Sequence, residues 1–299
     1  MLRLWLGYIE SESGASVRPS RWAAEPYMCI GLKIVFILLE FLLENERARL
    51  ALMSLRPSPD WVHESSIRGG QVWQYSEALS TALIQLSNAT RGFESEGSSY
   101  RMPQQHAIYH EYASHPNVRT ICETGFNAGV SAAVWLIANP RARVVMFDLW
   151  EHAAAPVAER WLREHIPGAD ERLVIYRGPS HLGLNKAAAD GVRCDVLSID
   201  GGHSRRVALS DLRGMCNLAT RRNTLLIDDT NCQAEWCVNV DRAVRDFNRS
   251  INGGLSVIEA HSWHLHKKGY SKGLSVLRYP PHVTAAACMG NSTLMERKH

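Results

Sequence analysis

Acidic residues end two apolar segments of this chain, and a histidine follows one of them closely. Asp200 comes directly after the apolar run at 194–199, in the motif I-D-G-G-H that ends at His203, whereas Asp228 and Asp229 follow the run T-L-L-I. Three carboxylates brought together repel one another unless a cation or a proton neutralises them. A hard divalent cation such as Mg²⁺ prefers oxygen ligands of this kind. The sequence therefore predicts a metal site at Asp200, Asp228 and Asp229.

The same positions suggest acid–base chemistry. An imidazole has an ordinary pKa of about 6.5, so His203 could take a hydroxyl proton near neutral pH, more easily if a metal acidified that hydroxyl. Strand carboxyl ends in an open α/β sheet face the ligand crevice, which would bring Asp200 and Asp228 together. The alternative is that the carboxylates cap the helices that follow and that His203 is a structural residue. The convergence of four such residues favours a site.

A glycine turn supplies a second candidate site. Residues 118–129 read V-R-T-I-C-E-T-G-F-N-A-G: an apolar run ends at Glu123, a turn carries Gly125 and Gly129, and helical composition follows. A strand, glycine turn and helix in this order can present backbone N–H groups to a nucleotide-like ligand. The full G-x-G-x-x-G pattern is missing, because Asn127 stands where a glycine is usual. A purely structural turn is the alternative.

Asp148 ends the next apolar segment. A carboxylate there can accept both hydroxyls of a ribose that lies across the end of the sheet. Its alternative role is that of a helix N-cap, because Glu151 follows at capping-box spacing.

Apolar segments alternate regularly with helical ones after residue 117. We expect strands near 118–123, 143–149, 172–176, 194–199 and 224–227, and two closing strands at 255–260 and 274–278 around a loop at 266–272. Nearly continuous apolar strands separated by helices indicate a parallel sheet covered on both faces. The last two strands lack an intervening helix, which predicts an antiparallel hairpin at one edge.

Composition limits the partners of the protein. The chain has 299 residues, of which 45% are hydrophobic and 21% are charged, and its net charge is +3. This balance does not predict a nucleic-acid partner, because such proteins usually carry a concentrated basic face. We divide the chain into an extension with a linker (1–70), a folded domain (71–280) and a polar tail (281–299).

The extension contains a strongly apolar segment at 27–43, interrupted by Lys33 and Glu40. A membrane anchor, a targeting leader and a helix packed on the domain are all compatible with it. The seven cysteines form no C-x-x-C pair, so we expect reduced thiols packed as small hydrophobic residues. That expectation favours a cytoplasmic protein, with membrane association through 27–43 as an option.

Four motifs together resemble a known family. E-T-G-F-N-A-G, the D-L at 148–149, I-D-G-G-H and L-L-I-D-D are similar to those of class I S-adenosylmethionine-dependent methyltransferases, in the macrocin O-methyltransferase-like branch called methyltransferase domain 24. The resemblance covers roughly residues 104–279. It implies an α/β fold: a Rossmann-like three-layer α/β/α sandwich whose mostly parallel seven-stranded sheet ends in an antiparallel C-terminal hairpin strand.

The resemblance also implies roles for individual residues. Glu123, Gly125, Asn127 and Gly129 would hold the methionine end of S-adenosylmethionine, Asp148 would hold the ribose, and Ser180 lies in the loop near the adenine. That loop lacks the acidic residue common in the family. In the metal-dependent small-molecule O-methyltransferases, catechol O-methyltransferase among them, the positions of Asp200, Asp228 and Asp229 hold Mg²⁺, and a lysine base stands where this chain has His203.

The expected function is therefore methyl transfer from S-adenosylmethionine to an oxygen of a small molecule, assisted by a divalent metal. The alternatives are a non-catalytic cofactor-binding or membrane-tethered scaffold protein and, less favoured, a nicotinamide-dependent oxidoreductase. His261, His264 and His266 lie around the closing hairpin beside Trp263 and Tyr270. His264 and His266 share a strand face, but no nearby Cys or Asp completes a metal site, so we expect these residues to line a substrate pocket or to face solvent.

Overall fold

The computed structural model describes residues 77–90, 99, 102–265, 270–281 and 285–289. The chain divides into two compact units, Met1–Gly70 and Gln71–His299. The described ranges do not include the apolar segment at 27–43 or His266. Within the described part of the chain, no helix is both long and apolar enough to cross a membrane.

A seven-stranded sheet forms the centre of the second unit, with the order β3-β2-β1-β4-β5-β7-β6. Its first five strands run parallel, and β7 pairs antiparallel with both β5 and β6. The predicted fold class is confirmed. The strands are β1 (Thr120–Thr124), β2 (Arg143–Asp148), β3 (Leu173–Arg177), β4 (Cys194–Ile199), β5 (Ala219–Asp228), β6 (Ser256–Leu265) and β7 (Tyr270–Arg278).

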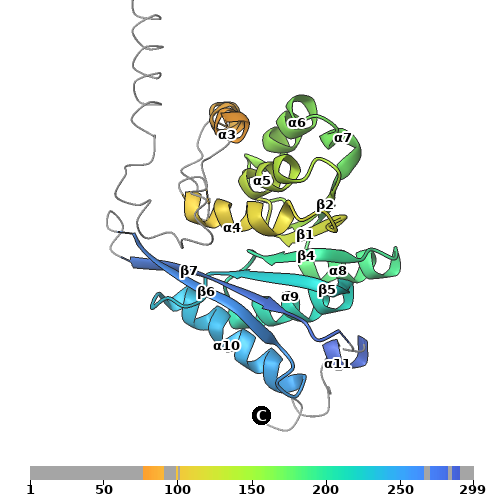
Figure 1. Cartoon of the computed structure of the whole chain (residues 1–299), viewed down its shortest axis with the longest axis vertical. Coiled ribbons are helices and arrows are strands. Elements are labelled where there is room, and N and C mark those ends of the chain that lie inside the picture. Colours follow the sequence, from red (N-terminus) through yellow and green to blue (C-terminus); the bar gives the residue numbers. More distant parts are fainter. Residues whose placement is uncertain (1–76, 91–98, 100–101, 266–269, 282–284, 290–299) are drawn as a thin grey trace, which may run out of the picture. The chain divides into compact units, whose positions relative to one another are not determined.

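Helices cover both faces of the sheet (Figure 1). One layer contains α3 (Glu77–Thr90), α4 (Pro103–Ala113), α5 (Val130–Ala138), α6 (Ala155–His165) and α7 (Ala169–Arg172). The other contains α8 (Ser180–Ala189), α9 (Arg205–Leu218), α10 (Glu235–Ser250) and α11 (Ala285–Met289). Each layer buries its own hydrophobic cluster against the sheet, which explains why the central strands are apolar on both faces.

Three strands are longer than the sequence predicts. β5 begins at Ala219, and the closing hairpin extends to Leu265 and starts again at Tyr270. Lys272, which the sequence places in a loop, therefore lies within β7 and pairs with Trp263 of β6. Ser, Lys and Gly have weak strand propensity, but pairing with a neighbouring strand overrides that propensity.

The cysteines are another correction. Three disulfides join Cys122 to Cys194, Cys216 to Cys288 and Cys232 to Cys237. The prediction of reduced thiols is wrong for these six residues, because the fold brings together cysteines that are up to 72 positions apart. The expectation of a cytoplasmic location loses the support that it took from reduced thiols.

The third correction concerns the segment predicted as a polar tail. It contains α11, which the disulfide from Cys288 attaches to α9.

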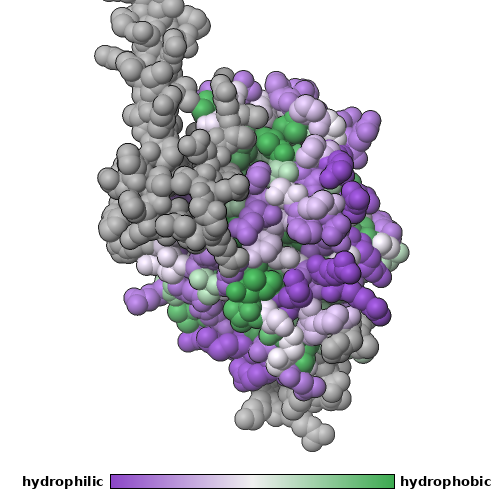
Figure 2. All heavy atoms as spheres, in the orientation of Figure 1, coloured by the Kyte–Doolittle hydropathy of each residue, from purple (hydrophilic) through white to green (hydrophobic). Residues whose placement is uncertain are grey.

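The surface of the described residues is mostly polar. Figure 2 shows one face on which hydrophilic residues predominate and hydrophobic residues form smaller patches. The large apolar side chains that remain exposed are spread over several elements: Leu149, Val157, Leu182, Trp236, Val257 and Ile258. Scattered exposure of this kind is normal for a globular protein and defines no interface by itself.

Candidate active site

The two predicted sites meet at Gly125. Its φ is +96°, and a Cβ atom there would lie 2.0 Å from the backbone oxygen of Asp200. The Asp200 amide donates to the backbone oxygen of Thr124 at 3.0 Å, which fixes the end of β4 against the end of β1. Only glycine permits this approach, so the glycine turn and the acidic end of β4 form one continuous region.

Glu123 lies beneath the glycine turn, is fully buried and accepts three hydrogen bonds. Ser131 Oγ and Trp135 Nε1 donate to Oε2 at 2.6 and 2.9 Å, and Ser198 Oγ donates to Oε1 at 2.9 Å. Burial raises the pKa of Glu123 to about 7, although these hydrogen bonds oppose the shift. Both carboxylate oxygens are thus engaged by α5 and β4, and they hold the start of α5 to the sheet.

Asp148 organises the turn directly. Its Oδ2 accepts from the backbone N–H of Phe126 and of Asn127 at 2.7 and 3.2 Å, and its Oδ1 accepts from the N–H of Trp150 at 2.6 Å. A carboxylate has about four acceptor positions, so one remains for a ligand hydroxyl. Asn127, which replaces the usual glycine, adopts a φ of +48°.

Ser180 begins α8 and donates to Asp211 Oδ1 of α9 at 2.6 Å. Asp211 is almost fully buried, and burial raises its pKa to about 6 against the opposing hydrogen bond from Ser180. The hydroxyl of Ser180, which the resemblance places in the loop near the adenine, is therefore already used in a hydrogen bond between α8 and α9.

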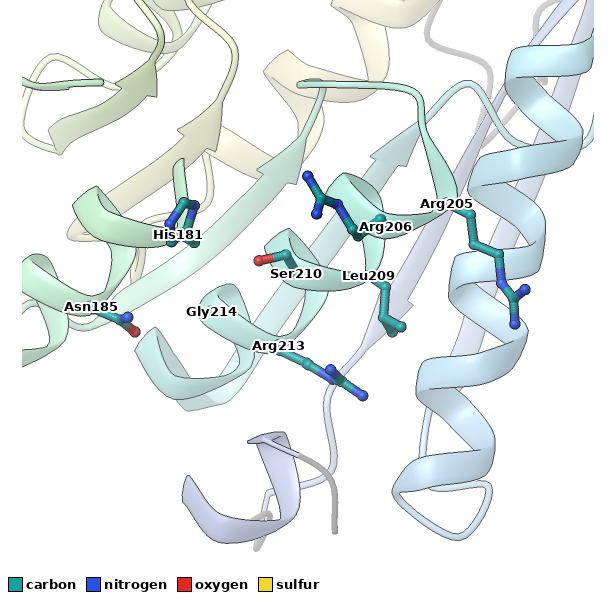
Figure 3. A pocket seen from close by; sticks show the side chains of 8 residues that line it. All are labelled: His181, Asn185, Arg205, Arg206, Leu209, Ser210, Arg213 and Gly214. Atoms are coloured by element: carbon teal, nitrogen blue, oxygen red, sulfur yellow. The ribbon is translucent and has the colours of Figure 1, made fainter. Parts of the chain in front are cut away.

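A groove runs between α8 and α9, and Figure 3 shows that His181 and Asn185 line it from α8. The α9 wall carries Arg205, Arg206, Leu209, Ser210, Arg213 and Gly214. The side chain of Arg205 turns toward α10, where it pairs with Asp246. The groove includes none of the predicted site residues.

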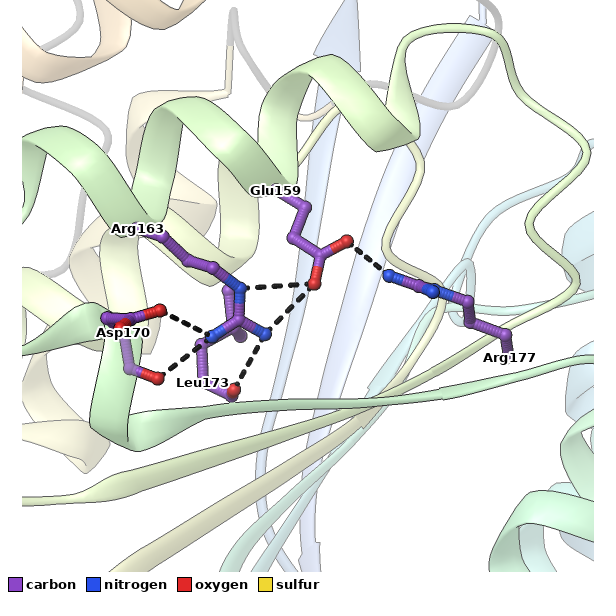
Figure 4. A network of polar contacts seen from close by, with 5 residues as sticks. All are labelled: Glu159, Arg163, Asp170, Leu173 and Arg177. Atoms are coloured by element: carbon purple, nitrogen blue, oxygen red, sulfur yellow. Dashed lines mark hydrogen bonds and ion pairs between the residues drawn. The ribbon is translucent and has the colours of Figure 1, made fainter.

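A network of polar contacts joins α6 to both ends of β3 (Figure 4). Glu159 of α6 accepts from Arg163 at 2.9 Å and from Arg177 at 2.5 Å. The guanidinium carbon of Arg177 lies 4.5 Å from the centre of the Trp150 ring. Because Arg177 pairs with Asp148 in the sheet, this stack holds Trp150 next to the predicted ribose carboxylate.

The acidic cluster at the ends of β4 and β5 comprises Asp200, Asp228 and Asp229, and two basic side chains lie against it. His203 Nε2 is 2.9 Å from Asp229 Oδ2. Lys272 Nζ is 2.6 Å from Asp228 Oδ2 and 3.8 Å from Asp229 Oδ1. Asp200, His203 and Asp229 each offer a ligand atom, and these three atoms lie within 4.8 Å of one another.

These contacts change the protonation of the cluster. Burial and the charge of Asp228 raise the pKa of Asp200 well above its usual range, although part of the residue's surface is exposed. The hydrogen bond with Asp229 raises the pKa of His203 against the effect of burial. Burial would lower the pKa of Lys272, but the neighbouring aspartates raise it, so the ammonium stays charged.

The capping alternative fails for all these carboxylates. Ser204 caps α9 through a hydrogen bond from Val207 N to its hydroxyl, whereas the N-cap residues of α6 and α10 are Ala154 and Ala234, which provide no side-chain cap. Four non-glycine residues with positive φ also follow strands here: Asn127, Trp150, Asp229 and Asn231. Such conformations are unfavourable and cluster at functional sites.

The hairpin histidines have other partners. His261 Nε2 lies 2.8 Å from Glu259 Oε2, and its ring stacks on Trp263. Tyr112 of α4 donates to the other oxygen of Glu259 at 2.7 Å. His261 thus belongs to a contact between β6 and α4. The side chains of His264 and Tyr270, like His266, lie outside the described part of the structure.

Lys272 is the site residue that the sequence prediction missed. The signal was weak, because Lys272 stands between Ser271 and Gly273, in a segment that reads as a loop. Gly273 was the better clue. A Cβ atom there would lie 2.0 Å from the backbone oxygen of Thr230, so β7 approaches the end of β5 very closely.

Comparison with known proteins agrees with this geometry. A profile of the family Methyltransf_24, described as a methyltransferase domain, matches residues 122–230. No curated protein sequence matches the chain significantly. The matched segment begins in β1 and ends just beyond Asp228 and Asp229, so it contains every predicted site residue.

Solved structures share the fold. The O-methyltransferase TomG from Streptomyces achromogenes, involved in tomaymycin synthesis and solved with S-adenosylmethionine, is 19% identical; the match covers 69% of this chain and 91% of that one, with a TM-score of 0.53. An O-methyltransferase from Bacillus cereus, in complex with S-adenosylhomocysteine, is 14% identical over 66% and 90% of the two chains, with a TM-score of 0.54. Cofactor-bound Rv0187 from MTB is 21% identical over 74% and 98%, with a TM-score of 0.52.

Residues 122–230 match a methyltransferase domain, and the strand order and the carboxylates at the strand ends agree with the class I S-adenosylmethionine-dependent methyltransferases that the motifs resemble. The nicotinamide-dependent alternative receives no support from the family match.

Proposed function

We propose that this enzyme transfers the methyl group of S-adenosylmethionine to a hydroxyl oxygen of a small molecule. The observation that carries the proposal is the pair formed by His203 and Asp229, which lies beside the glycine turn at the carboxyl ends of β4 and β5. A proton acceptor next to the methyl donor is what oxygen methylation requires. The names of the structural relatives point the same way, because two of them are O-methyltransferases.

The chain's own residues suit the cofactor. The turn from Gly125 to Gly129 would hold the methionine end, and Asp148 would accept a ribose hydroxyl at its remaining acceptor position. Trp150, fixed by Arg177, would contact the adenosine part. The bound cofactor supplies an electrophilic methyl group on sulfur.

His203 would act as the base. If Nε2 donates its hydrogen to Asp229, the lone pair of Nδ1 can accept the proton of the acceptor hydroxyl. The O–H bond then breaks as the O–C bond forms, and the S–C bond breaks to leave S-adenosylhomocysteine. Asp229 fixes the ring and stabilises the imidazolium that results.

A divalent ion, which the sequence predicts, fits this site only in part. The three ligand atoms of Asp200, His203 and Asp229 support it. Against it, Lys272 already pairs with Asp228, the remaining predicted ligand. We therefore assign the ion no step in the reaction.

The test uses wild-type protein and the variant His203→Gln with a panel of phenols, catechols and sugars. Release of S-adenosylhomocysteine identifies an acceptor, and calorimetry measures cofactor binding. We expect both proteins to bind the cofactor and only the wild type to turn over at an appreciable rate. Cofactor binding without turnover on any acceptor would instead favour the non-catalytic scaffold. A cytoplasmic location and membrane association through 27–43 remain proposals that fractionation of the full chain would test.

A further inference from the structure

Lys272 occupies an unusual position for a lysine. Its side chain is only 13% exposed, and its Nζ atom lies 2.6 Å from Asp228 Oδ2, in a carboxylate that is fully buried. Lysine is almost never buried without a partner, because desolvation of the ammonium is costly. The pair therefore places a permanent positive charge inside the acidic cluster.

The backbone fixes this position. Gly273 brings β7 so close to the end of β5 that a Cβ atom would overlap the backbone oxygen of Thr230, and the Thr230 amide donates to the Gly273 oxygen at 3.2 Å. On its other side, Lys272 pairs with Trp263 in the sheet. The backbone at Lys272 is thus fixed on one side by its pairing with Trp263 and on the other, through Gly273, by the contact with Thr230.

A divalent ion at Asp228 would conflict with this arrangement. Mg²⁺ binds carboxylate oxygens at about 2.1 Å. An ion on Asp228 Oδ2 would therefore lie within about 5 Å of Nζ, which is 2.6 Å from the same oxygen. Two cations that close repel strongly in a buried site.

We propose that Lys272 is the resident cation of this active site and takes the place of the divalent metal. It is a positioning residue: it neutralises Asp228 and leaves Asp229 to orient His203. The inference rests on the proposed function, because it concerns the active site of that reaction. Its test measures metal binding and does not depend on methyl transfer.

The experiment measures binding of Mn²⁺, which suits the same oxygen ligands as Mg²⁺, by the loss of the electron paramagnetic resonance signal of the free ion. The proteins are treated with EDTA and desalted first, and neither cofactor nor acceptor is added. We expect no stoichiometric binding by the wild type. Lys272→Met, which removes the charge but keeps the length, should bind Mn²⁺ at least ~10-fold more tightly than the wild type.

Two further variants make the result specific. Lys272→Met combined with Asp228→Asn should lose the binding that Lys272→Met gains, and Lys272→Arg should behave like the wild type because it keeps the charge. Lys186→Met is the matched control, since Lys186 pairs with Asp190 on the exposed surface of α8 and should leave Mn²⁺ binding unchanged.

Stoichiometric Mn²⁺ binding by the wild type, or no gain on removal of Lys272, would overturn the proposal. If Lys272→Met fails to fold, the wild type and Lys272→Arg still decide, because the proposal requires both to lack a stoichiometric site. Absence of turnover on every acceptor would count against the proposed function and leave these binding results intact.

Discussion

The carboxylates at the ends of β1 and β2 and those at the ends of β4 and β5 are stabilised in different ways. Glu123 and Asp148 each accept three hydrogen bonds from neutral donors of the chain itself. Asp228 and Asp229 depend instead on the basic groups of Lys272 and His203. The first pair is bound into the scaffold, whereas the second is coupled to groups that can carry or exchange a proton. Hence we expect the first region to hold a ligand and the second to do chemistry.

The largest effect should come from removing the base. His203→Gln should lower kcat by roughly 10²- to 10⁴-fold, which is the usual contribution of a positioned acid–base group. Cofactor affinity should stay unchanged, because the turn that would bind it is held by Asp148. Release of S-adenosylhomocysteine and calorimetry measure the two quantities.

The control for this variant is His181→Gln, which alters an exposed histidine of α8 outside the site. It should keep full activity. A near-wild-type kcat in His203→Gln would show that the region at the ends of β4 and β5 has no catalytic role. The difference between this region and the one at the ends of β1 and β2 would then not hold.

Glu123→Ala should cost about 3 kcal/mol of folding stability, because it leaves buried donors such as Trp135 Nε1 without an acceptor and opens a cavity. Denaturant unfolding measures this loss. If the free energy of unfolding of Glu123→Ala equals that of the wild type within experimental error, Glu123 does not stabilise the fold.

The pH dependence of stability should reveal the same carboxyl group. Burial raises the pKa of Glu123 from 4.5 to about 7 in the folded state. Between these values the folded protein keeps a proton that the unfolded chain has lost, so the contribution of Glu123 to stability falls as the pH rises through this window. The difference should be on the order of 2–3 kcal/mol and should level off above pH 7 or so.

Denaturant unfolding at pH 5 and pH 7.5 checks this expectation. Glu123→Gln, which has the same shape and an acceptor oxygen for Trp135, should lack this part of the pH dependence. Identical pH profiles of the variant and the wild type would contradict it.

The smallest expected effect concerns Asp148. Asp148→Ala should weaken S-adenosylmethionine binding about tenfold, the value of a hydrogen bond to a charged group, as calorimetry would measure. Asp195→Ala is the matched control. Asp195 also accepts three hydrogen bonds, from the amides of Arg119 and Thr120 and from Thr220 Oγ1, but at the opposite end of β1. Equal cofactor affinities in the two variants would show that Asp148 serves only the fold.

Predictions from the sequence succeeded where local pattern carries the information. Nearly continuous apolar runs such as 194–199 form strands because both faces of the sheet are covered, and the acidic residues that follow them meet at one edge. The lengths of β5 and of the hairpin were less predictable, since pairing with a neighbour, rather than local propensity, extends those strands.

The sequence by itself determined the order of strands and helices, the glycine turn and the acidic strand ends, because each is encoded within a few consecutive residues. Only the tertiary structure decided the partners of those acidic groups. Asp148 meets amides 21 and 22 positions away, and Cys122 meets Cys194 across 72 positions. Lys272 reaches Asp228 from a strand that the sequence reads as a loop. Contacts between residues distant in the chain depend on how the strands pack, which no local pattern specifies.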